Sequence, residues 1–348
     1  MDGAGTIDSP WLVRTAADFD LIRTCVNVDG DIVGYFKQMN NISLAGYNWA
    51  PLEYFYGNFD GGNYSITDLT SDYPADYAGL FYRVNGVAEN IRIVNCSING
   101  RYAAALATGV NLGTIRNCRS SGSVTGYYDA GGLIQTGDQS GVIHDCRSSC
   151  VVTSTNGIAG GFIGSLTGTV TKCCATGNVT AAAQAGGFAG SANYSYQNLD
   201  ITNCYAMGDV SGSIAGGFLG TLDLRGAANH KIFTNCYSKG LVTATSSYHG
   251  GLIGRTNVTN GTYTVTSCYY DYQTSGQSDT GNGEPRTTAQ MKTRGTFIGW
   301  DFTTPIWYLN TGNYGYPHFD PVGGTYARAN HLINYQSKVI QFQRAIVS

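Results

Sequence analysis

The chain has 348 residues, a net charge of −3 and only 12% charged residues. Its Lys and Arg residues are scattered singly and form no basic cluster, which argues against nucleic acid as a partner. No apolar run reaches the roughly 18 residues that would span a membrane. The sequence contains 48 Gly and 25 Tyr but only 7 Pro. Small, β-branched and aromatic residues with few helix formers indicate an all-β protein.

Residues 1–77 precede the regular repeats and are predicted to form an N-terminal cap with one short helix. Ser9–Val13 predicts a short strand, and the helix is expected to start after Thr15, a potential N-cap that Asp18 follows in the first turn. Asn58–Asn63 predicts a turn between later strands. A cap would cover the first coil, whose open edge would otherwise template pairing with another chain.

Residues 78–275 repeat one phrase with a period of roughly thirty residues, which is typical of a stacked repeat fold. Each copy holds three short apolar segments: a GG[LF] segment, a segment that ends in Cys, and a Val-Thr segment six residues later. Three strands per coil predict a parallel β-helix, or β-solenoid, which we expect to be right-handed with glycines at its corners. Ala104-Ala105 replaces one glycine pair, and Cys150 replaces a corner glycine.

One part of each coil has a constant length and the other part varies. The distance from each Cys to the second Gly of the next pair is 13 to 15 residues, whereas the distance from that Gly to the next Cys ranges from 12 to 19. Insertions in a solenoid form loops on one side, often the binding side. We therefore expect specificity to lie in three insertions: Ala192–Leu199, Leu222–His230 and Thr256–Tyr263.

A cysteine recurs once per coil. Metal binding is disfavoured because no C-x-x-C pair exists, and stacked parallel side chains meet disulfide geometry poorly. We therefore predict a structural ladder of small buried thiols, with neither metal nor cofactor, formed by Cys96, Cys118, Cys146, Cys173, Cys204, Cys236 and Cys268. Cys25, Cys150 and Cys174 lie outside this ladder and are the better candidates for a cross-link. Asn often precedes the ladder Cys, and its direction, inward or outward, stays open.

The repeat pattern ends after Cys268. Residues 276–321 are predicted to form a C-terminal cap that gathers Phe297, Trp300, Phe302 and Trp307. Residues 322–348 form a tail rich in apolar residues, which we expect to serve in docking or oligomerisation.

The GG[LF]xG and NCYxxGxV phrases resemble those of the GLUG-repeat family of bacterial surface proteins. The flanks are similar too, namely Gly5–Trp11, Asn58–Asn63 and Gly299–Phe302. The resemblance covers residues 3 to 320 and excludes the tail. It implies a β-solenoid in adhesins, large surface proteins or phage fibres, and it implies no catalytic residues.

Exposed aromatic residues give the best binding signal, because Tyr offers a flat face and a hydroxyl at low entropic cost. The candidates in turns or insertions are Tyr127, Tyr128, Tyr194, Tyr196, Tyr248 and Tyr263. Glycoside hydrolysis would need two close carboxylates, but the acids occupy different positions in their repeats. We therefore predict no catalytic residues, although loops could still bring two acids together.

The sequence thus favours a non-enzymatic extracellular protein for adhesion or assembly. Its expected partners are a surface glycan or receptor, or other subunits, including copies of itself. Because the N-terminus shows no signal peptide, a virion protein released by lysis is slightly favoured over a bacterial surface adhesin, and both stay open. The alternative is a polysaccharide lyase or glycosidase on the same scaffold.

Overall fold

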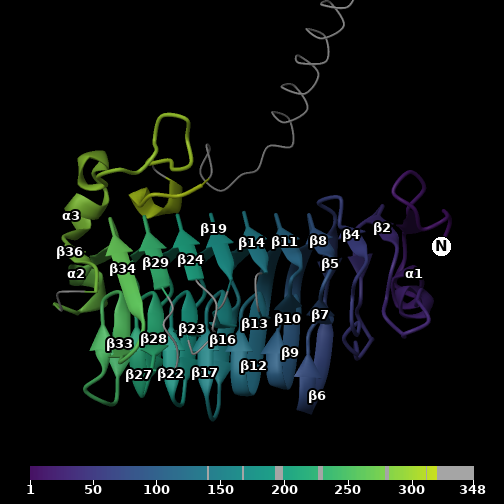
Figure 1. Ribbon diagram of the computed structural model, residues 1–348, viewed down its shortest axis with the longest axis horizontal. Helices are drawn as coiled ribbons and strands as arrows, with labels where there is room; N and C mark the ends of the chain where they lie inside the picture. Colours follow the sequence, from purple (N-terminus) through teal and green to yellow (C-terminus); the bar gives the residue numbers. More distant parts are fainter. Residues whose placement is uncertain are drawn as a thin grey trace, which may run out of the picture.

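The structure, a computed structural model, describes residues 1–138, 141–166, 168–192, 199–225, 230–278, 282–310 and 312–319. Short strands pair in parallel, coil upon coil, around one elongated core (Figure 1). The predicted all-β parallel β-helix is therefore confirmed. None of the described helices is long and apolar enough to cross a membrane.

The strands form three sheets. Sheet A contains, in spatial order, β1 (Trp11–Val13), β2 (Tyr35–Gln38), β4 (Asn58–Asp60), β8 (Val87–Glu89), β11 (Thr114–Arg116), β14 (Val142–His144), β19 (Thr169–Thr171), β24 (Leu199–Thr202), β29 (His230–Thr234) and β34 (Thr262–Thr266). Sheet B contains β7 (Phe81–Val84), β10 (Ala107–Asn111), β13 (Ile134–Asp138), β18 (Ile163–Ser165), β23 (Ala189–Ala192), β28 (Leu219–Leu224) and β33 (Ile253–Val258).

Sheet C bends around a corner, so it holds two or three strands of each coil. Its members are β3 (Ile42–Ser43), β5 (Ser65–Thr67), β6 (Thr70–Ala78), β9 (Arg92–Ala104), β12 (Arg119–Gly131), β15 (Arg147–Ser148), β16 (Val151–Ser154), β17 (Ile158–Gly160), β20 (Cys174–Ala175), β21 (Val179–Ala181), β22 (Gln184–Gly186), β25 (Tyr205–Ala206), β26 (Val210–Gly212), β27 (Ile214–Gly216), β30 (Tyr237–Ser238), β31 (Val242–Ala244), β32 (His249–Gly250), β35 (Tyr269–Asp271) and β36 (Glu284–Arg286). A typical coil runs from β14 in sheet A through β15, β16 and β17 in sheet C to β18 in sheet B.

Identical positions of successive coils stack in register inside the core. After the glycine pair, the rings of Phe162, Phe188 and Phe218 stack with centroids 4.9 and 4.7 Å apart. The valines of the Val-Thr segment form a second column, in which Val152 pairs with Val179 on the next coil. Both columns are buried, so burial of these repeated apolar side chains stabilises the stack.

The corners explain the other repeated residues. A Cβ on Gly187 would lie 2.1 Å from the carbonyl oxygen of Gly217 on the next coil, so no side chain fits there. The residue before each ladder Cys adopts the left-handed conformation, with φ of 56° at Asn203 and 54° at Asn235. Asn tolerates this conformation better than most residues. Its side chain runs along the stack, since Asn235 Nδ2 donates to Asn203 Oδ1 (3.3 Å).

The predicted ladder loses one member, Cys96. Strand pairing places Cys96 opposite Gly122, whereas Ile91, whose carbonyl accepts from the N–H of Arg119, takes the ladder position beside Cys118. The Cys96 thiol instead contacts that of Cys150, which occupies the Gly122 position one coil further along. The prediction for Cys96 was therefore wrong, because the sequence Asn95-Cys96 repeats Asn117-Cys118 at a different corner.

The other six cysteines of the predicted ladder do stack. The N–H of Cys118 lies 3.3 Å from the Cys146 sulfur, and the N–H of Cys236 lies 3.4 Å from that of Cys268. All six are at most 2% exposed, and burial raises the pKa of the Cys146 thiol well above its ordinary value. None of the ten cysteines, all of which lie in the described part of the chain, forms a disulfide, and this includes the cross-link candidates Cys25, Cys150 and Cys174.

The coils begin inside the segment predicted as a cap. In sheet A, β1 already pairs in parallel with β2, β2 with β4, and β4 with β8. Helix α1 (Ala16–Leu21) follows β1, and the 3₁₀ helix η1 (Ile22–Thr24) continues it. Thr15 and Asp18 form the capping box that starts α1, which confirms the predicted start. The buried Phe19 ring packs against Trp49 and Phe59, so α1 covers the end of the core.

The C-terminal segment covers three coils from the side. It contains α2 (Tyr272–Ser275), α3 (Thr288–Met291), η2 (Arg294–Thr296) and η3 (Gly312–Gly315), and β36 still belongs to sheet C. The predicted aromatic cluster forms here and packs on Tyr205, Tyr237 and Tyr269 of successive coils. Figure 1 shows the backbone of this segment at the upper left. Trp307 Nε1 donates to Asn203 Oδ1 (3.0 Å). The predicted tail, residues 322–348, lies outside the described residues.

Candidate functional site

The three longest strands of sheet C place tyrosines beside one another on the surface. Pairing sets Tyr77 of β6 next to Tyr102 of β9, and Tyr102 next to Asp129 of β12. The rings of Tyr77 and Tyr102 stack 5.2 Å apart, and those of Tyr102 and Tyr128 lie 5.9 Å apart. We call the connected set the tyrosine cluster; its members are Tyr54, Tyr77, Tyr82, Tyr102, Tyr127 and Tyr128.

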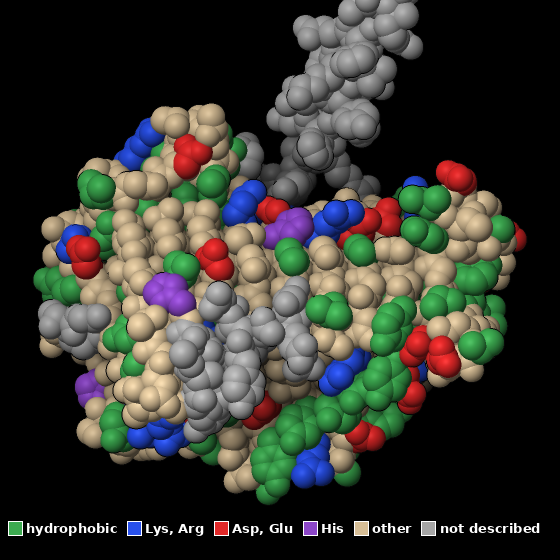
Figure 2. Space-filling view, viewed as in Figure 1, with side chains coloured by type: hydrophobic (Ala, Val, Ile, Leu, Met, Phe, Trp, Pro, Cys, Tyr) green, Lys and Arg blue, Asp and Glu red, His purple; other side chains and the backbone are tan. Residues whose placement is uncertain are grey.

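The tyrosine cluster forms a partly exposed band. Figure 2 shows hydrophobic side chains gathered at the lower right, over the region of β6, β9 and β12, with charged side chains along them. Tyr54 and Tyr127 are 43% and 48% exposed. The Arg101 guanidinium lies 5.0 Å from the centre of the Tyr128 ring, and Arg83 lies 5.7 Å from that of Tyr82. These cation–π contacts hold two positive charges at the band.

A cavity of about 220 Å³ opens between the tyrosine cluster and sheet B. Glycine at position 109 helps to form it, because a Cβ there would lie 3.3 Å from Arg83 Nε. The cavity joins aromatic rings to side chains with several hydrogen-bonding atoms. Its lining consists of Tyr77, Tyr82, Arg83, Tyr102, Thr108, Gly109, Asp129, Gln135, Thr136 and Ser165.

Asp129 is the acid of this cavity. Burial raises the pKa of its carboxyl above the ordinary value, although hydrogen bonds from the Ile158 N–H and the Gln135 amide oppose the shift. Gln135 Nε2 donates to Asp129 Oδ2 at 3.3 Å. Burial, together with contact with Tyr77, raises the pKa of Tyr82 to about 12, so its hydroxyl stays protonated at neutral pH. The cavity therefore offers neutral hydroxyls, an amide and a carboxyl for hydrogen bonding.

The structure separates the other predicted tyrosines from this site. Tyr248 lies between β31 and β32, on a coil near the C-terminal end of the stack, where the Arg255 guanidinium lies 4.3 Å from its ring centre. Tyr263 of β34 is half-buried, and its hydroxyl donates to Asn282 Oδ1 (3.0 Å). Tyr194 and Tyr196 lie outside the described residues, as does much of the insertions Ala192–Leu199 and Leu222–His230.

Sequence reasoning found Tyr127 and Tyr128 but missed four members of the tyrosine cluster. Tyr77, Tyr102 and Tyr128 are separated by 25 and 26 residues, which is close to one coil. That spacing was the signal that could have found them. Tyr54 and Tyr82 are likewise 28 residues apart, but they lie on another segment of their coils.

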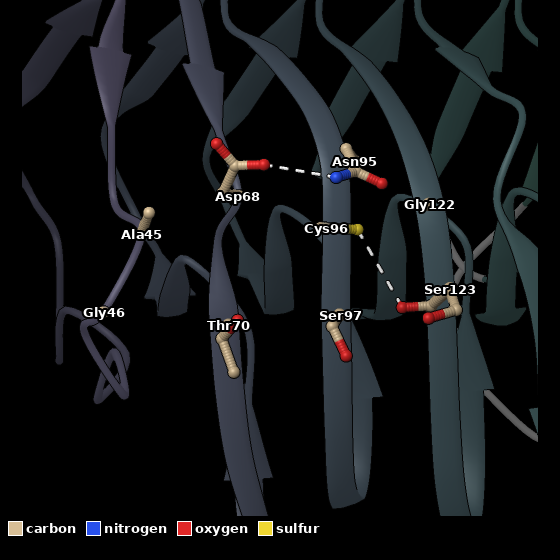
Figure 3. Close-up of a pocket in the computed structure, with 9 residues that line it drawn as sticks. All are labelled: Ala45, Gly46, Asp68, Thr70, Asn95, Cys96, Ser97, Gly122 and Ser123. Carbon is tan, nitrogen blue, oxygen red and sulfur yellow. Dashed lines mark hydrogen bonds between the residues drawn. The ribbon is translucent and has the colours of Figure 1, made fainter.

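A larger hollow of about 620 Å³ lies at another corner of sheet C (Figure 3). Small side chains and backbone line it, together with Asp68, Asn95 and Cys96. Its polar groups bind one another: Asn95 Nδ2 donates to Asp68 Oδ1 (3.2 Å), and this bond lowers the pKa of the Asp68 carboxyl. None of the described residues that line the hollow is aromatic, so the smaller cavity is the better candidate for a binding site.

Comparison with known proteins supports the fold and leaves the family open. No family model matches the chain. A candidate Gly-rich membrane protein of Evansella cellulosilytica is 39% identical over 127 residues, which are 34% of this chain and 14% of that protein. Halomucin of Haloquadratum walsbyi is 31% identical over 150 residues, 38% of this chain and 2% of that protein. The chain thus spans a small part of these relatives.

A solved structure extends the similarity over most of the chain. The crystal structure of a candidate immunoglobulin A1 protease from Bacteroides ovatus superposes with a TM-score of 0.58 and 22% sequence identity. The match covers 91% of this chain and 94% of that one. At this identity the likeness shows the shared β-helical fold alone.

Proposed function

We propose that the protein is a non-enzymatic surface module that binds a glycan through the tyrosine cluster and its cavity. The observation that carries the proposal is the tyrosine cluster, whose six rings are in contact with one another beside Arg83, Asp129 and Gln135. Sugars present apolar ring faces edged by hydroxyls. Aromatic rings pack against such faces, and planar polar side chains pair with adjacent hydroxyls.

The names of two relatives support a location at the cell surface. One is named as a membrane protein and the other as a halomucin, and both are far longer than the matched segment. Neither supports the virion favoured from sequence, so we propose that this solenoid belongs to the cell surface. The resemblance to GLUG-repeat surface proteins is part of the same proposal.

A glycan panel tests this function. Purified protein is titrated with neutral and acidic bacterial and plant polysaccharides by isothermal titration calorimetry. We expect binding to at least one of them, and about tenfold weaker binding by Tyr102→Ala, since one stacked ring contributes about 1.4 kcal/mol. Tyr248→Ala is the matched control, because Tyr248 is 45% exposed but lies away from the tyrosine cluster. Equal losses from the two substitutions would refute the site.

An enzyme on the same scaffold is the second candidate, and Asp129 favours it. A carboxyl whose pKa is raised by burial could serve as a general acid. Glycoside hydrolysis needs a second carboxyl nearby, but Asp129 is the only one among the described residues that line the cavity. Release of new reducing ends or unsaturated sugars, abolished by Asp129→Asn, would establish the enzyme instead.

A further inference from the structure

The cavity beside the tyrosine cluster is a groove that runs along the stacking direction of the coils. Its floor is one column of sheet B: Gly109 pairs with Arg83 on one side and Thr136 on the other, and Thr136 pairs with Ser165. These four residues lie on consecutive coils. Parallel strands lie about 4.8 Å apart, so the floor extends for about 14 Å.

One wall of the groove has the same repeat. Tyr77, Tyr102 and Asp129 occupy one position of sheet C on three consecutive coils. Their side chains therefore recur once per coil along the groove, and the first two rings lie 5.2 Å apart. Each of these three coils contributes one wall group and one floor position to any ligand that lies there.

The two ends of the groove differ. At the N-terminal end, Tyr54 precedes Arg83 in the floor column, because the bridges of Leu52 with Phe81 and Phe55 with Val84 set that register. Tyr54 is 43% exposed, so this end is open. Beyond Ser165, the next floor residues, Ser191 and Thr221, are 0% and 3% exposed. The open part of the groove therefore ends within one coil of Ser165.

We infer that the groove binds a short linear stretch of polysaccharide lying parallel to the solenoid axis, with one sugar unit on each coil. This inference rests on the proposed glycan-binding function. The coil spacing is close to the length of one unit in an extended β-linked chain, so successive units meet equivalent positions. A ligand lying across the coils would contact one wall group only. The open floor accommodates about three or four units at the spacing of parallel strands.

Oligosaccharide ladders test the inference. Oligomers of β-1,4-linked glucose, N-acetylglucosamine and galacturonic acid, from disaccharide to hexasaccharide, are titrated calorimetrically. If another polysaccharide binds in the panel, its partial hydrolysate supplies the ladder. We expect affinity to rise about fivefold to tenfold per added unit up to the tetrasaccharide and then to level off. Affinity that is constant from the disaccharide onward would overturn the inference while leaving glycan binding intact.

End-specific variants give an independent readout. Tyr54→Ala removes the tyrosine ring at the open end of the groove. Gly109→Val fills the middle of its floor, where the atoms nearest to an added Cβ belong to the Arg83 side chain and the Tyr82 carbonyl, at 3.3 to 3.6 Å. Tyr54→Ala should weaken the tetrasaccharide and spare the disaccharide, whereas Gly109→Val should weaken all lengths at least tenfold. Equal effects of Tyr54→Ala on every length would contradict the axial placement. Failure of all glycans to bind would instead refute the proposed function, and Tyr248→Ala remains the control.

Discussion

Replacing Phe188 tests whether stacked columns hold the coils together. Phe188 is fully buried, and its ring lies between those of Phe162 and Phe218 with interplanar angles of 9° and 4°. Phe188→Ala removes a buried aromatic side chain, which costs about 3–5 kcal/mol. It also removes two ring contacts worth about 0.5–1.5 kcal/mol each beyond area burial. We therefore expect a loss of about 4–8 kcal/mol in the free energy of unfolding.

Phe188→Leu is the matched variant, because the same column position holds Leu133 and Leu252 on other coils. Phe188→Leu keeps most of the buried volume. In addition to the ring contacts, we therefore expect it to lose less than about 1.5 kcal/mol in the free energy of unfolding. Urea unfolding, followed by far-ultraviolet circular dichroism and by tyrosine fluorescence, measures both variants. Coincident curves from the two probes are needed, since stacked repeats can unfold in parts. A loss below about 1 kcal/mol for Phe188→Ala, or equal losses for both variants, would refute this reasoning.

Three further predictions follow from other positions. Asn203→Gly should lower the free energy of unfolding by about 1–3 kcal/mol, because Trp307 Nε1 loses its hydrogen-bond acceptor. Asn203→Ala should cost about 1–2 kcal/mol more, because Ala fits the left-handed backbone of this position poorly, and equal losses for the two variants in urea titrations would contradict this. In native protein, a thiol reagent should label Cys25 alone, and more rapidly at alkaline pH because burial raises the pKa of the Cys25 thiol. Labelling of further cysteines without denaturant would argue against the buried ladder. Burial raises the pKa of Asp129 in the folded protein, so the contribution of Asp129 to stability is full below about pH 3.9 and is lost as the pH rises through the folded pKa. Asp129→Asn should flatten the dependence of the melting temperature on pH in this range, and an unchanged dependence would refute the raised pKa.

The sequence predicted the scaffold well where one physical requirement repeats. The glycine pairs recur because a Cβ would strike the next coil, as at Gly187, and the valine column recurs because it is buried. The position of Cys96 could not be settled from its Asn-Cys motif, since left-handed corners recur more than once in a coil. The spacing of 22 residues between Cys96 and Cys118, shorter than a coil, was the discordant sign.

The candidate site was harder to predict than the fold. Tyr127 and Tyr128 stand out in the sequence as a pair. Whether a tyrosine belongs to a binding surface depends on its neighbours on adjacent coils, and the strand pairing determines which residues those are. In the strand pairing, Tyr102 is the partner of Asp129 rather than of Tyr128, because the register shifts between Gly126 and Asp129. The early coils escaped prediction for a related reason. They lack the glycine pairs, although β2 and β4 stack like later strands.

One measurement tests the central claim most directly: the affinity of the protein for the tightest-binding polysaccharide of the panel, with and without the Tyr102 ring. Calorimetric titration of wild type, Tyr102→Ala and Tyr248→Ala, with reducing-end analysis of the same samples, gives both binding and turnover. We predict about tenfold weaker binding for Tyr102→Ala, wild-type binding for Tyr248→Ala and no products in any sample. Undiminished binding by a folded Tyr102→Ala variant, or sugar release by the wild type, would contradict the account.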